Sequence, residues 1–109
     1  MSHFYEKICT EEDIWDKIND GWSGLSFQQR KVWELVKRMP EQWLRQSYNM
    51  RFWTIGLIGE YVIWYDHTEE EFYLGKWTQY GFIHGDYNYG GSWQLSYVVQ
   101  MLLNNITDQ

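Results

Sequence analysis

The chain has 109 residues, of which 44% are hydrophobic and 22% charged, and its formal net charge is −6 at pH 7. No linker rich in Pro, Ser or charge divides it, so we expect one compact domain over residues 1–109. The acidic balance argues against a nucleic-acid-binding protein, because phosphate binding requires Lys and Arg clustered over the contact surface.

The first half of the chain has the pattern of helices. Thr10 is a good N-cap for a first helix over 11–19, in which apolar residues recur at helical spacing. Ser26 can cap a second, longer helix that runs to Met39, with an apolar stripe on one side and basic residues facing water. The basic residues of this region are interpreted as a solvated face: Arg30, Lys31, Lys37, Arg38, Arg45 and Arg51.

A proline follows the second helix. Pro40 either ends that helix or stands at the first position of another, where its missing N–H leaves no helical hydrogen bond unmade. Residues 41–46 are mostly good helix formers. We therefore expect a short third helix there.

Beyond Asn49 the periodicity changes from helical to strand-like. Residues 52–65 form a β-branched and aromatic series, in which Gly56 and Gly59 mark a turn or a bulge between two strands. The polar group 66–69 then turns the chain into a further strand over 71–80. These segments predict a small antiparallel β-meander.

The last part of the chain returns to helix. The glycine-rich segment 81–91 is either a loop or a last hairpin with residues 86–88 near its tip. Ser92 can cap a final helix whose apolar stripe is wide enough to close the sheet. The prediction is an α+β domain with N-terminal helices, a small antiparallel β-meander and a C-terminal helix packed on the sheet.

Neither a membrane span nor a disulfide is expected. Segments without a charge, such as 52–59, are far shorter than the roughly 18 residues of a membrane helix, and acidic residues stand where a signal peptide needs an apolar region. The single cysteine, Cys9, cannot form an internal disulfide, which agrees with a reducing compartment. We expect a cytoplasmic protein.

Two histidines are the candidates for catalysis. His67 beside Asp66 and His84 near Asp86 could act as a general acid and base, as a metal-independent ribonuclease needs. Both lie in predicted turns, and no Lys or Arg close in sequence could stabilise a pentavalent phosphate. A protein without catalysis is therefore favoured, with a small ribonuclease using His67 and His84 as an alternative.

Motifs for metals and cofactors are missing from the sequence. The His and Glu residues between 67 and 84 lack the spacing of two ligands one helical turn apart, and a lone cysteine excludes the usual structural zinc site. The glycines of 85–91 are not followed by the Lys and Ser or Thr of a phosphate loop. We expect no metal and no cofactor.

Aromatic residues make up 20% of the chain. Most of the eight Trp are expected in the core, whereas Tyr is enriched where a protein meets a partner. The plainer interpretation of the acidic run 66–71 is a charged hairpin tip that keeps an edge strand soluble. The alternative is a negative patch with aromatic anchors that docks on Lys and Arg of another protein. The candidate binding residues are Asp66, Glu69, Glu70, Glu71, Asp86, Tyr87 and Tyr89.

This small, acidic and Trp-rich chain, with the run GEYVIWYD at 59–66 and a helix after GGSW at 90–93, resembles bacterial immunity proteins. It is similar in particular to those of contact-dependent growth inhibition and related polymorphic toxin systems. The resemblance implies a cytoplasmic antidote that binds the C-terminal domain of a cognate toxin, often a nuclease, and neutralises it. A carbohydrate-binding module, with exposed rings stacked on sugars, is a further alternative.

Overall fold

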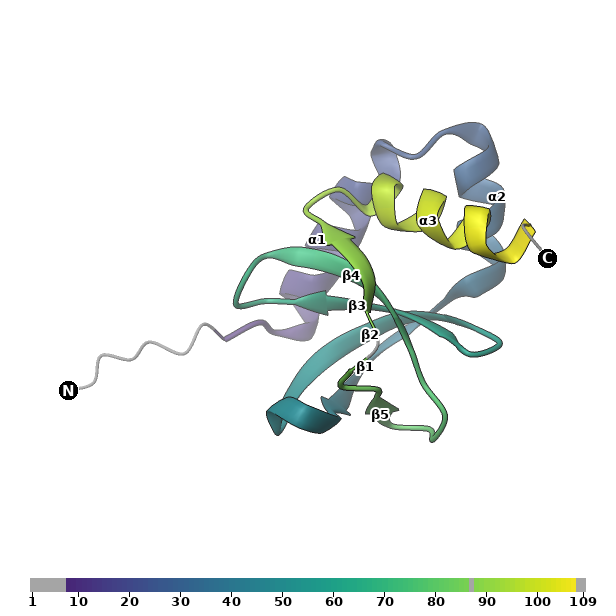
Figure 1. Cartoon of the computed structure of the whole chain (residues 1–109). Helices are drawn as coiled ribbons and strands as arrows, with labels where there is room; N and C mark the ends of the chain where they lie inside the picture. Colours follow the sequence, from purple (N-terminus) through teal and green to yellow (C-terminus); the bar gives the residue numbers. More distant parts are fainter. Residues whose placement is uncertain (1–7, 87, 108–109) are drawn as a thin grey trace.

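The computed structural model describes residues 8–86 and 88–107, which form three helices and a six-stranded sheet (Figure 1). The helices are α1 (Glu11–Ser23), α2 (Phe27–Val36) and α3 (Leu95–Thr107), and a 3-10 turn, η1 (Gln46–Tyr48), precedes the second strand. The strands are β1 (Lys37–Arg45), β2 (Met50–Ile58), β3 (Tyr61–Asp66), β4 (Glu71–Lys76), β5 (Phe82–Ile83) and β6 (Asn88–Ser92). The predicted α+β class, with helices before the sheet and a closing helix after it, is confirmed.

Both N-terminal helices begin where the sequence predicts. The Thr10 hydroxyl accepts a hydrogen bond from the Asp13 N–H at 3.1 Å, and the Asp13 carboxylate accepts one from the Thr10 N–H at 3.0 Å. Ser26 and Gln29 form the same reciprocal box at the start of α2. Such boxes satisfy N–H groups that lack an intrahelical partner, so the starts of both helices are set by local sequence.

The predicted third helix over 41–46 is wrong, as is the extension of the second helix to Met39. The second helix ends at Val36, and residues 37–45 instead form β1, which pairs antiparallel with β2. Pro40 lies inside the register shift of that pairing, so its missing N–H falls at an irregular part of a strand. Strand pairing and the complete burial of Trp43 outweigh the local helix propensity.

Strands β2 to β4 form the predicted meander, β1 adds a strand that was not predicted, and the whole strand order is β5-β1-β2-β3-β4-β6. Pairing is antiparallel except between β1 and β5. The two edge strands β5 and β6 are separated by residues 84–87 alone. In a flat six-stranded sheet the two edge strands would lie about 24 Å apart. The chain from the end of β5 to the start of β6 is five residue steps long and can span about 18 Å at most. The sheet therefore curls toward closure.

Two hydrophobic clusters lie on the two faces of the curled sheet. The larger one fills the space between the sheet and the helices, which gather on one side of the sheet in Figure 1. It contains strand residues such as Ile63 and Leu74 and helix residues such as Leu102. The second lies on the opposite face, inside the curl, and consists of Trp43, Phe52, Val62, Trp64 and Ile83. Both faces of β3 are thus buried, which explains its continuously apolar sequence.

The C-terminal helix packs on the sheet as predicted, with Val98, Val99 and Leu102 buried. It begins at Leu95, later than directly after Ser92, whose hydroxyl accepts a hydrogen bond from the Gln94 N–H at 3.0 Å. The glycine-rich segment 81–91, predicted as a loop or a last hairpin, instead contributes β5 and most of β6, which are not paired with each other. Gly91 of β6 lies so close to the Tyr73 ring of β4 that a side chain would not fit there.

Candidate binding site

The acidic turn between β3 and β4 carries carboxylates with different roles. Asp66 is only 7% exposed, and its Oδ1 accepts hydrogen bonds from the Thr68 N–H at 2.9 Å and the Thr68 hydroxyl at 2.6 Å. The Glu69 N–H donates to the same oxygen at 3.3 Å. Asp66 therefore holds the turn together, while Glu69 and Glu70 are exposed and Glu71 is half-buried.

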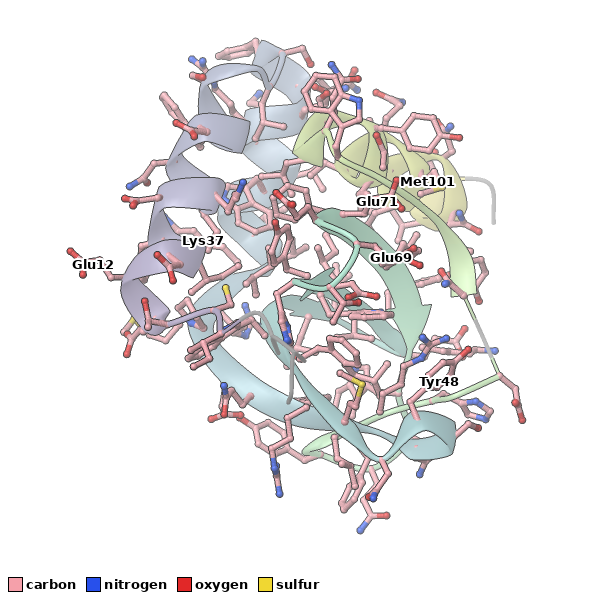
Figure 2. The ribbon with its side chains drawn as sticks, turned by 90° about the vertical axis from the view of Figure 1, so that its left-hand side faces the viewer. Glu12, Lys37, Tyr48, Glu69, Glu71 and Met101 are labelled. Carbon is pink, nitrogen blue, oxygen red and sulfur yellow. The ribbon has the colours of Figure 1, made fainter. Side chains whose placement is uncertain are left out.

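Tyr73 on β4 joins two of these glutamates. Its hydroxyl lies 2.6 Å from Glu69 Oε1 and 3.0 Å from Glu71 Oε1, and Figure 2 shows the two glutamates close to one another. Its ring stacks on Trp64 with centroids 4.8 Å apart. Burial and the hydrogen bonds to both carboxylates raise the pKa of Tyr73 well above its usual range. Since the hydroxyl has one proton, Tyr73 donates to one glutamate at a time and keeps the two carboxylates close to one another.

On its outer side the turn meets the first helix across a shallow groove of about 460 Å³. The Nζ atom of Lys17 lies 3.8 Å from Glu70 Oε1. His67 and Ile8 also border the groove. We define the acidic groove by the charged residues that line it: Asp13, Asp16, Lys17, Asp20 and Glu70.

Sequence reasoning missed the contribution of α1 to this negative surface. Asp13, Asp16 and Asp20 are spaced by three and four residues, which places them on one face of a helix. This spacing could have identified an acidic helix face from the sequence. The helix supplies three of the four carboxylates of the groove. Glu12, in contrast, does not line it and points outward at the edge of the molecule in Figure 2.

On its inner side the turn borders a second cavity, of about 300 Å³, inside the curl of the sheet. The guanidinium group of Arg45 lies 3.8 Å from the ring centroid of Tyr48 and 5.0 Å from that of Trp64. One of its nitrogens donates to the Gly85 carbonyl at 3.3 Å. Because Arg45 lines this cavity together with the carboxylates of Asp66 and Glu69, the inner side is less negative than the acidic groove.

Two of the three remaining predicted binding residues, Asp86 and Tyr89, lie in the part of the chain that the structure describes. Asp86 is exposed, and its N–H donates to Nδ1 of His84 at 3.2 Å. Tyr87 lies outside the described residues. Tyr89 is half-buried and packs on the Tyr61 ring at 5.6 Å, next to the helix-side cluster. Because Tyr61 begins β3 and the acidic turn follows its end, Tyr89 and the turn lie at opposite ends of that strand.

The two histidines belong to different parts of the sheet. His67 follows β3, with its ring 5.7 Å from that of Phe52, and its buried Nδ1 lacks a hydrogen-bond partner among the described residues. His84 follows β5 at the edge beside β1. Within 8–86 and 88–107, no group of three or more His, Cys, Asp or Glu is arranged to hold a metal ion.

Most tryptophans belong to the core, as predicted, and the two exposed ones are Trp22 and Trp93. The tyrosines of β3 and β4 are buried or half-buried. Tyr80 stands out in that region, because it is 61% exposed. The rings nearest the acidic turn therefore serve mainly to position its carboxylates.

Comparisons of the chain with protein-family models, with curated proteins and with solved structures yield no match. In the part of the chain that the structure describes, no helix is both long and apolar enough to cross a membrane.

Proposed function

We propose that the protein is an immunity protein that binds a basic toxin domain through the acidic groove and neutralises it. The observation that carries this proposal is the convergence of α1 and the β3–β4 turn. Two segments about 50 residues apart in the chain contribute carboxylates to one surface around Lys17. A toxin domain that acts as a nuclease is the partner class that this surface favours.

The electrostatics support a basic partner. The groove has four carboxylates against one ammonium group, a surplus of three negative charges. A nuclease concentrates positive charge at its active site in order to bind phosphate, and the same charge attracts an acidic protein. Complementary charges speed the encounter and fix the orientation of a complex. An enzyme that acts on nucleic acid would, with this charge, repel its own substrate.

Apolar and uncharged groups at the groove are also suited to contact. Ile8 is 82% exposed at the groove margin. His67 also lines the groove. A standard interface buries roughly 800 Å² on each partner, so the groove and its margins would form the centre of a larger contact.

The test is capture followed by inhibition. Tagged protein is incubated with a lysate of the bacterium that encodes it, washed at low and high salt, and the retained protein is identified by mass spectrometry. The captured toxin domain is then purified and its activity titrated with the protein. Inhibition that is complete at one equivalent is the expected result.

A matched pair of variants ties the result to the groove. Asp16→Asn with Glu70→Gln removes two charges from the groove, whereas Glu12→Gln with Glu34→Gln removes two charges outside it. Only the first pair is expected to weaken capture and inhibition. Equal weakening by both pairs would argue against the groove, and a retained protein whose activity is not inhibited would overturn the immunity proposal.

A further inference from the structure

A separate cavity of about 280 Å³ opens between β1, β2 and the loop that follows β4. It shares no lining residue with the acidic groove. It lies on the sheet face opposite the helices, since Trp43 of the inner cluster forms part of its wall. Its other lining residues include Glu41, Thr54, Leu57 and Tyr80.

Glu41 is a carboxylate held in one position. Its Oε1 accepts a hydrogen bond from the Trp43 indole N–H at 2.8 Å and another from the Tyr80 hydroxyl at 2.6 Å. The Tyr80 bond, followed by the Trp43 bond, lowers the pKa of Glu41 from its ordinary value. Both bonds use Oε1, and within 8–86 and 88–107 no hydrogen bond involves the other carboxylate oxygen, so that oxygen is available to a donor from outside.

Thr54 supplies a second acceptor in the same cavity. The residue is 2% exposed, and its buried hydroxyl has no hydrogen-bond partner among the described residues. A buried hydroxyl without a partner costs free energy, so the great majority of such groups are satisfied. Thr54 is the strand partner of Glu41 in the β1–β2 ladder. Directly paired residues of this kind have neighbouring side chains, so one planar group can reach both.

Aromatic rings complete the environment. The rings of Trp43 and Tyr80 are 4.9 Å apart and tilted by 59°, and Trp77 contacts both of them edge-on. Ring faces attract cations, and a guanidinium group can stack on a ring while donating in its own plane. Among the described residues that line the cavity the one cation is Arg38, and a single nitrogen of its guanidinium group donates to the carbonyl groups of Val36 and Lys37.

We propose that this cavity binds the guanidinium group of an arginine side chain of a partner protein, with Glu41 and Thr54 as the acceptors and Tyr80 as the stacking ring. A planar group with several donors fits two acceptors on adjacent strands better than a compact ammonium group does. The exposed side chains of Met39 and Tyr80 form an apolar margin, which is typical of a protein contact. If the proposed function holds, the partner is the toxin domain.

The test is a titration of the isotope-labelled protein with N-acetyl-arginine amide, followed by the NMR signal of the Trp43 indole N–H that donates to Glu41. Saturable shifts with a dissociation constant of about 1 mM are expected, as for a single anchoring group. Glu41→Gln should weaken binding about tenfold, because the charge-assisted bond is lost. Thr54→Val should weaken it about threefold. Glu12→Gln, which removes an equal charge elsewhere, should change nothing.

Four outcomes would overturn the proposal. Equal binding of the uncharged citrulline derivative would mean that the cavity recognises the shape of the side chain and not its charge. Tighter binding of the lysine derivative would favour an ammonium site, and tighter binding of free arginine would favour a small-molecule site. Binding that appears only after Arg38→Ala would mean that Arg38 fills the cavity itself. The titration needs no toxin, so its failure leaves inhibition through the acidic groove untouched.

Discussion

Lys17 of α1 lies 3.8 Å from Glu70 of the β3–β4 turn, and the two side chains are both about half exposed. An exposed ion pair of this kind contributes little to folding stability. Its significance is geometric, because it marks where the acidic turn meets the acidic face of the first helix.

Substitutions in the groove should change the rate of toxin binding in opposite directions. Asp16→Asn and Glu70→Gln should slow association several-fold at low salt, whereas Lys17→Ala should accelerate it, because long-range attraction follows the net charge of the surface. The differences should shrink at high salt. Stopped-flow fluorescence with the purified toxin domain measures this. If Lys17→Ala and Asp16→Asn shifted the rate in the same direction, electrostatic steering would be the wrong explanation.

Asp66 should prove to be a stability residue. Asp66→Ala removes a buried acceptor of three hydrogen bonds and should lower the free energy of unfolding by about 2 kcal/mol. Glu69→Ala, at an exposed position of the same turn, should cost about 0.5 kcal/mol or less. Urea unfolding of both variants checks the difference. Equal stabilities would contradict the role assigned to Asp66.

Gly91→Ala should destabilise the sheet, because the added methyl group would meet β4. A Cβ atom at this position would collide with the Tyr73 ring and approach the Phe72 carbonyl oxygen at 2.9 Å. We expect a loss of about 1–3 kcal/mol, as for overpacking in a core. Gly24→Ala is the matched control, because its nearest neighbour would be 3.6 Å away and its φ is −91°. Thermal unfolding should separate the two variants clearly.

Thr54→Val should stabilise the protein while it weakens guanidinium binding. The substitution replaces a buried hydroxyl that has no partner among the described residues by a methyl group of similar size. The free energy of unfolding should rise by about 1 kcal/mol, because the folded state no longer buries a hydroxyl group without a hydrogen bond. Urea unfolding and the arginine titration, carried out on the same sample, test both parts. A loss of stability would mean that the hydroxyl is satisfied in solution, for example by water.

Tyr65 should make the protein sensitive to alkaline pH. Burial, followed by the charge of Glu70, raises the pKa of Tyr65 from 10.0 to about 12. The folded state therefore keeps a proton that the unfolded state loses above pH 10, so this contribution is intact below pH 10 and declines from there to about pH 12. Relative to Tyr65→Phe, the wild type should lose at most about 1.4 kcal/mol per pH unit in this range. Guanidine unfolding at a series of pH values measures the difference, and parallel curves would contradict it.

Features set by local chemistry could be predicted from the sequence. The starts of α1 and α2 follow from capping residues that act within four positions of one another. β1 could not be predicted in this way, because its strand conformation depends on pairing with β2 and on the burial of Trp43, both of which are tertiary effects. Pro40 fits a helix start and an irregular strand equally well by sequence alone.

The candidate site was predictable only in part. The acidic run 66–71 is visible as a sequence, but burial of Asp66 and its hydrogen bonds depend on the turn that it forms. Alternate residues of β3 point to opposite faces of the sheet, but neither face is exposed, because the helices cover one and the inner cluster covers the other. For that reason the sequence does not distinguish exposed tyrosines from buried ones. The pairing of Glu41 with Thr54 likewise appears only once β1 is recognised as a strand.

Burial of β3 on both faces has a consequence for folding during synthesis. Residues 61–65 are all aromatic or β-branched and carry no charge, which is the composition of segments that associate into intermolecular sheets. Once folded, this segment is flanked by β2 and β4, so neither of its edges is open. During synthesis it stays unprotected until β4 has emerged and paired. The steps that complete the meander therefore also determine how long a new chain is exposed to aggregation.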